Sequence, residues 1–131
     1  MKRVLPLLLV LSLLAACRPP EGSGTAGGQA PEGVRTRIEL NGPARIGPVP
    51  VTVFLLGDGE GISGATVTVT GDMTHAGMVP VIRTAAETAP GEYTAADFEF
   101  NMGGDWFLLA AVTLPDGTSF EVVEPVSVSG N

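Results

Sequence analysis

Residues 65–70 read Ala-Thr-Val-Thr-Val-Thr, and this stretch decides the fold. Successive side chains of an extended strand point to opposite faces, so Ala65, Val67 and Val69 lie on one face and the three threonines on the other. Residues 51–55, which read Val-Thr-Val-Phe-Leu, repeat the alternation. A period of two predicts half-buried β-strands, and the domain sequence nowhere shows the period of an amphipathic helix.

Short runs of this kind recur along the chain, separated by turn sequences rich in Gly, Pro and Asp. They predict seven strands, over residues 34–40, 51–56, 65–70, 79–84, 93–100, 106–114 and 119–128. Residues 114–118, Leu-Pro-Asp-Gly-Thr, predict a hairpin turn between the last two. Tyr93 follows Pro-Gly-Glu near a strand start, a position that suits a tyrosine corner. Seven short strands predict an all-β fold, an immunoglobulin-like antiparallel β-sandwich.

The composition excludes several other classes of protein. Eighteen Gly and 11 Pro among 131 residues disfavour a large helical bundle, because both residues break helices. Seven Lys plus Arg against 14 Asp plus Glu give a net charge of −7, which disfavours nucleic-acid binding. One Cys and one His exclude an intrachain disulfide, a cysteine-based zinc cluster and a site with several histidines. Because the chain has no nucleophile elbow and no phosphate-binding loop, we expect that the protein is not an enzyme.

The N-terminus has the pattern of a targeting signal. A basic start, Met-Lys-Arg, precedes an apolar run over residues 4–16. A helix needs about 20 residues to span a bilayer, so this run is too short to cross one and instead fits a signal peptide. Residues 14–17, Leu-Ala-Ala-Cys, resemble the bacterial lipobox. The resemblance implies that residues 1–16 are a lipoprotein signal peptide and that Cys17 is diacylated, which would anchor the protein stably in a membrane.

The residues after the cysteine bear on the location and the linker. Arg18 stands where an Asp would resemble an inner-membrane retention signal, which slightly favours the outer membrane in a two-membrane bacterium. Residues 17–33 are rich in Pro, Gly and Ser and predict a lipid-anchored flexible linker without contacts to the domain, which would occupy residues 34–131. The mature chain keeps five arginines against 14 carboxylates, a net charge of −9. We therefore expect an acidic domain on the extracytoplasmic face of the cell envelope.

Sulfur and imidazole side chains gather in two short segments. Residues 71–78 read Gly-Asp-Met-Thr-His-Ala-Gly-Met, and residues 101–106 read Asn-Met-Gly-Gly-Asp-Trp. Thioether and imidazole ligands suit copper(I), whereas zinc prefers thiolate, further imidazoles or carboxylate. The predicted copper(I) ligands are Met73, His75, Met78 and Met102. Trp106 is expected beside the ion as a cation–π face, and Asp72 and Asp105 as oxygen ligands for copper(II) or as an outer shell.

The same residues allow another interpretation. Methionine fills gaps in cores, a Met beside a Trp makes a favourable sulfur–aromatic contact, and a single His often has only a structural hydrogen bond. Exposed sulfurs would favour a metal site, and a sealed apolar environment would favour core packing.

Three segments carry a family resemblance: GDMTHAGMVPV, PGEYTA and FNMGGDWFLLAAVTLPDG. They resemble the bacterial YtkA-like/FixH-like domain over roughly residues 34–125, through a Met-x-His element, a Gly-x-Tyr element and a Met, Gly and Trp element that leads into a strand. The resemblance implies copper delivery and assembly of haem–copper oxidases, and it carries over to Met73, His75, Met102 and Trp106. FixH itself has a transmembrane anchor, whereas this chain has the lipid-anchor pattern.

Two functions therefore remain as expectations. The first is an envelope lipoprotein that binds copper(I) in copper handling or oxidase assembly, with a copper-transport or oxidase-assembly protein as partner. The second is an immunoglobulin-like interaction module without a metal, tethered to a membrane complex.

Overall fold

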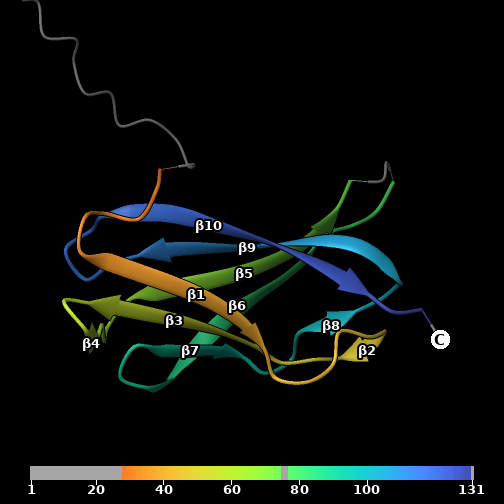
Figure 1. The fold of residues 1–131 in the computed structure, drawn as a ribbon, viewed down its shortest axis with the longest axis horizontal. Helices are drawn as coiled ribbons and strands as arrows, with labels where there is room; N and C mark the ends of the chain where they lie inside the picture. The colour runs from red at the N-terminus through yellow and green to blue at the C-terminus, as the bar shows by residue number, and fades with distance from the viewer. Residues whose placement is uncertain (1–27, 75–76, 131) are drawn as a thin grey trace, which may run out of the picture.

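The computed structural model describes residues 28–74 and 77–130, and their fold is all-β (Figure 1). The strands in chain order are β1 (Val34–Leu40), β2 (Gly47–Pro48), β3 (Val51–Gly57), β4 (Glu60–Gly61), β5 (Thr66–Met73), β6 (Val81–Ala89), β7 (Glu92–Ala95), β8 (Glu99–Phe100), β9 (Gly104–Thr113) and β10 (Ser119–Val128). The residues in these two ranges form no helix. Among them there is therefore no helix that could cross a membrane.

The seven longer strands follow the immunoglobulin order. With β1, β3, β5, β6, β7, β9 and β10 taken as strands A to G, one layer has the order A-B-E-D and the other C-F-G. All pairings between these strands are antiparallel. Strand β6 joins the layers, because its residues 81–85 pair with β5 and its residues 86–89 pair with β7. The predicted antiparallel sandwich is confirmed.

The seven predicted strands are all present, with differences in length. β1 and β10 have the predicted bounds, while β5 extends to Met73 because Gly71 and Met73 continue the buried alternation. The predicted strand over residues 93–100 is instead two strands, β7 and β8, separated by a turn in which the Phe98 N–H donates to the Ala95 carbonyl at 3.4 Å. The predicted hairpin is confirmed, since the Leu114 N–H donates to the Thr118 carbonyl at 2.8 Å between β9 and β10.

The core lies between the layers and consists of the alternate residues of the long strands. The fully buried side chains include Val51, Val53 and Leu55 of β3, Val67 and Val69 of β5, and Trp106, Leu108 and Val112 of β9. Each such side chain contributes about 1.5–3 kcal/mol through its removal from water. The β5 threonines that alternate with the valines lie on the outer face, as the period of two predicts.

An aromatic stack closes one end of this core. The rings of Phe98 and Phe100 meet edge to face at 5.3 Å, and those of Phe100 and Trp106 do so at 5.1 Å. Gly71 leaves the room that the stack needs, because a Cβ there would lie 2.6 Å from Phe98 Cζ. The end of β5 therefore packs bare backbone against aromatic rings.

The prediction that residues 18–33 make no contacts with the domain is wrong for residues 28–33. The Gly28 carbonyl accepts a hydrogen bond from the Glu121 N–H at 3.2 Å, and Ala30 packs against the core. Pro, Gly and Ser content alone indicated a linker here, but backbone groups can pair with the edge of β10 whatever their side chains. The preceding residues 1–27 lie outside the described part of the chain, and with them the predicted signal peptide and Cys17.

Tyr93 connects the two layers. Its hydroxyl donates to the Ile62 carbonyl at 2.6 Å and accepts from the Ala65 N–H at 3.0 Å. The expected tyrosine corner is wrong, because that motif lies on strand F and bonds to backbone a few residues upstream. Tyr93 lies on β7, the E strand, and bonds across the sandwich to the segment between β4 and β5.

We expect Tyr93→Phe to lower the free energy of unfolding by about 1–3 kcal/mol at neutral pH, because a carbonyl and an N–H lose their partner. Burial raises the pKa of Tyr93 above its ordinary value of 10.0. The neutral hydroxyl is thus the stabilising form, and its contribution is complete below pH 10 and lost as the pH rises through the raised pKa. Urea unfolding from pH 7 to pH 11 should show the gap between wild type and variant closing only at the alkaline end.

Thr113→Val is the matched control, because it removes a hydroxyl whose bond to Ser119, 3.0 Å long, is exposed. Its effect should stay within about 0.5 kcal/mol at every pH. A Tyr93→Phe effect no larger than this control would contradict a structural role for the hydroxyl.

Candidate functional site

The methionine-rich segments meet at one end of the sandwich, where β5 ends, β9 begins and the C-terminus lies (Figure 1). Met73 is the last residue of β5 and pairs across the ladder with Trp106 of β9. Gly104, at the start of β9, pairs with Val128 at the end of β10. The chain enters the domain at the other end, where Gly28 contacts Glu121 near the start of β10. The methionine-rich segments therefore lie at the end of the domain far from residue 28.

Met73 points into the sandwich and is 7% exposed. Its ε-methyl group lies over Gly104, where an added Cβ would be 2.8 Å from it. Gly104 also has a φ of +130°, a backbone conformation that favours glycine. The glycine at this position therefore leaves room for the end of the Met73 thioether.

Trp106 fixes the second segment. It is fully buried, and its indole N–H donates to the Met102 carbonyl at 3.0 Å. This bond holds the backbone of Met102 beside the aromatic stack, while the Met102 side chain is 46% exposed. A Cβ on Gly103 would lie 2.7 Å from the Gly130 nitrogen, so the same loop also packs closely on the C-terminal backbone. Trp106 thus lies between the two methionine segments.

The β5–β6 connection supplies the remaining sulfur. Met78 is half-buried and packs against the hydrophobic core, next to Gly77 with a φ of +92°. His75 and Ala76 lie outside the described residues, and with them the prediction that His75 is a ligand.

The structure separates the two aspartates from this group. Strand alternation places Met73 and Trp106 on the inner face, and Asp72 and Asp105 on the outer face. Asp72 Oδ1 accepts a hydrogen bond from the Met73 N–H at 2.8 Å, and Asp105 Oδ1 accepts one from Ser127 Oγ at 2.6 Å. The structure thus brings Met73, Met78, Trp106 and the Met102 backbone to one end of the domain and turns both carboxylates away from it.

The donor chemistry at this end is soft. The described residues contain no cluster of three or more His, Cys, Asp or Glu side chains that could hold a metal. Thioether sulfur is a soft donor that suits copper(I) and not the hard ions that oxygen ligands hold. Sequence reasoning did not identify Gly104 as the neighbour of the Met73 side chain or Phe100 as the ring that packs on Trp106. Only the Phe-Glu-Phe alternation before Met102 and the Gly-Gly pair after it pointed to their positions.

Comparison with protein families gives a match. A family model described as YtkA-like matches residues 28–110. The matched range contains Met73, His75, Met78, Met102 and Trp106, begins at the contact between Gly28 and β10, and ends within β9. No curated protein and no solved structure matches the chain.

Proposed function

The chain belongs to the YtkA-like family, and on that premise we propose that it is an envelope lipoprotein that binds copper(I), in copper handling or in assembly of haem–copper oxidases. Met73, Met78 and Met102 would hold the ion together with His75. The observation that supports this most is the position of Trp106, which pairs with Met73 across the ladder and binds the Met102 backbone. Two sulfur-bearing segments distant in sequence thereby reach the same end of the fold.

The residues at this end fit a copper(I) ion by their chemistry. The nearby carboxylates face the other side of the sheet, which leaves thioethers as the donors on the inner face. Copper(I) favours such ligands. Trp106 and Phe100, which are fully buried and pack on each other, would shield one side of a bound ion from water. Met102, at 46% exposed, would be the first thioether that an ion meets.

The place of the site suits a carrier anchored by its N-terminus. β10 runs the length of the domain, and its ten residues span about 30 Å at 3.3 Å per residue. Residue 28 enters near the start of this strand, and the methionine end lies where the strand ends. With a lipid on Cys17, the sulfurs would lie at the end of the domain farther from residue 28, within reach of a copper-transport or oxidase-assembly partner.

Competition for copper(I) against a chromogenic chelator tests the proposal. We expect Met73→Leu, Met102→Leu and His75→Ala each to weaken copper(I) binding about tenfold or more, since each removes a donor. Asp105→Asn is the matched control, because its carboxylate lies on the outer face bonded to Ser127. Its affinity should stay within twofold of wild type. If the three ligand variants bind copper(I) as tightly as wild type and Asp105→Asn do, the site is refuted.

One observation favours the interaction module as the second candidate. Met73 is 7% exposed and Met78 packs against the core, as methionines that only fill space would do. In that case Met73→Leu would leave copper(I) affinity unchanged and would alter only the free energy of unfolding. The same titration, paired with urea unfolding, separates the two functions.

A further inference from the structure

A second feature lies on the outer face of β1 and β3, away from the methionine end. It is a hollow of about 360 Å³ lined by Arg35, Thr36, Arg37, Phe54 and Leu56. An adjoining hollow of about 440 Å³ shares Arg35 and Leu56 and continues to Gly33, Asp58 and Gly59. Together they form a groove, here called the arginine groove, along the first strand pair of the sandwich.

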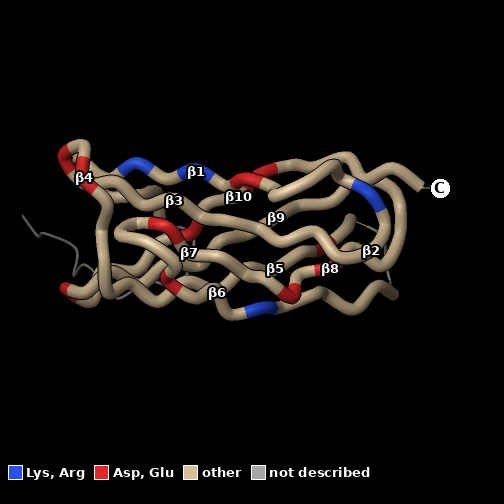
Figure 2. Tube along the Cα trace, turned by 90° about the horizontal axis from the view of Figure 1, so that it is seen from below, with Lys and Arg blue, Asp and Glu red and all other residues tan. Residues whose placement is uncertain are grey.

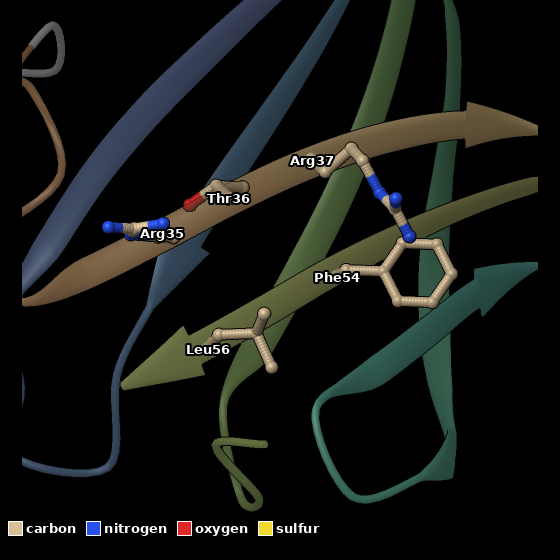
Figure 3. A pocket seen from close by; sticks show the side chains of 5 residues that line it. All are labelled: Arg35, Thr36, Arg37, Phe54 and Leu56. Atoms are coloured by element: carbon tan, nitrogen blue, oxygen red, sulfur yellow. The ribbon is translucent and has the colours of Figure 1, made fainter. Parts of the chain in front are cut away.

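The strand register pairs one cation with one apolar side chain at each step of the groove. Arg35 is opposite Leu56, and Arg37 is opposite Phe54. The Arg37 side chain points to the Phe54 ring (Figure 3). Its guanidinium lies 4.5 Å from the ring centre, and its Nε is 3.1 Å from Glu39 Oε1. Arg37 is therefore held in position, yet 64% of its side chain remains exposed. Leu56 is 40% exposed, so the apolar row is also open to a partner.

The charge of the groove contrasts with that of the rest of the domain. The described residues have four arginines and 13 carboxylates, and two of those arginines lie side by side on β1 (Figure 2). Arg83 is paired with Asp97 at 3.2 Å and Arg37 with Glu39 at 3.1 Å, whereas Arg35 has no ion pair within residues 28–74 and 77–130. The groove thus holds two of the four described arginines of an acidic domain, and Arg35 has its charge available to attract an acidic partner.

We propose that the arginine groove binds an extended segment of a partner protein in which acidic and apolar side chains alternate. Residues two apart on a strand are separated by about 7 Å, the spacing of Arg35 and Arg37 and also of alternate residues in an extended peptide. A bound segment lies between the two rows, so that its carboxylates point to one side, toward the two arginines, and its apolar side chains point to the other side, toward Phe54 and Leu56. The interaction combines charge-assisted hydrogen bonds with burial of apolar surface.

The width of the positive charge favours a peptide over a membrane surface. An anionic bilayer attracts a broad cluster of basic residues. Here the basic stripe is two residues long, Asp58 lines the far end of the groove, and Glu60 follows on β4. Carboxylates flank the two arginines, with Glu39 beside Arg37 and Asp58 beyond Arg35, so a flat anionic surface would meet these carboxylates as well, whereas a narrow segment can lie over the arginines alone.

The test uses the full-length protein as processed by a bacterial host. It is reconstituted in nanodiscs of zwitterionic phosphatidylcholine, which have no net charge. The probe is a fluorescein-labelled peptide of alternating Glu and Leu, compared by anisotropy with alternating Lys-Leu and Glu-Ser peptides. We expect saturable binding of the Glu-Leu peptide, at least about tenfold weaker binding of both others, and loss of affinity as salt is raised. The double variant Arg35→Gln/Arg37→Gln should weaken Glu-Leu binding about tenfold or more. Arg45→Gln, an exposed arginine outside the groove, is the matched control and should bind as wild type does.

Four results would overturn the proposal: no saturable binding of the Glu-Leu peptide, equal affinity in the double variant, equal loss in Arg45→Gln, or equal affinity for the Lys-Leu peptide. Binding to phosphatidylglycerol vesicles that requires both arginines, without peptide binding, would assign the groove to a lipid surface instead. Self-association that the double variant abolishes would assign it to a second copy of the chain.

Discussion

Replacing Trp106 with alanine is expected to lower the free energy of unfolding by about 3–5 kcal/mol. Trp106 is fully buried, packs edge to face on Phe100 at 5.1 Å and donates its indole N–H to the Met102 carbonyl. The truncation leaves a cavity between the layers and a carbonyl without its partner. Urea unfolding monitored by far-ultraviolet circular dichroism measures the loss, since the variant lacks the only tryptophan.

Phe107→Ala is the matched control, because Phe107 is the next residue on the same strand but lies on the outer face, 39% exposed. We expect a loss of less than about 1 kcal/mol there. The Trp106 variant should also weaken copper(I) binding, because the Met102 backbone loses its attachment to β9. Similar stabilities for the two variants would contradict the placement of Trp106 between the layers.

Gly91→Ala is expected to cost about 2–5 kcal/mol, because it combines backbone strain with overpacking. Gly91 has a φ of +78°, and an added Cβ would lie 2.5 Å from both the Gly61 Cα and the Leu55 carbonyl oxygen. The Gly91 carbonyl also accepts the Leu55 N–H at 2.8 Å, so the backbone cannot move away without losing that bond. The free energy of unfolding in urea measures the loss.

Gly59→Ala separates the two causes. Gly59 has a φ of +83°, nearly that of Gly91, but an added Cβ there meets no atom within 4 Å. Its cost should be that of the backbone conformation alone, about 1–2 kcal/mol. Equal losses in the free energy of unfolding for the two variants would contradict the close approach of Gly91 to Gly61 and Leu55.

The fold could be predicted from the sequence because the alternation is local. Val67 and Val69 on one face and threonines on the other identify β5 without knowledge of its neighbours. The ends of strands were harder to predict, since they depend on pairing partners. Residues 28–33 show this, because the Gly28 carbonyl accepts a hydrogen bond from the Glu121 N–H. Glu121 is distant in the sequence, and the composition of residues 28–33 does not indicate this pairing.

The candidate site was predictable in part for the same reason. Scarce sulfur residues beside glycines located the segments, but which face a side chain takes depends on register. Asp72 and Asp105 stand next to Met73 and Trp106 in the sequence, yet the alternation that buries the latter pair turns the aspartates outward. The arginine groove left no motif at all, because Arg35 and Leu56 become neighbours only through the β1–β3 register.

The central claim is that the methionine sulfurs at this end of the sandwich bind copper(I), and the methionine methyl groups report on it directly. Removal of residues 1–16 would leave three methionines, at positions 73, 78 and 102, so ¹³C-methyl-labelled methionine gives three signals by nuclear magnetic resonance. The account predicts that one equivalent of copper(I) shifts all three signals, and that zinc(II) shifts none. If Met73 and Met78 keep their positions in saturating copper(I), these sulfurs are core packing and the claim is wrong.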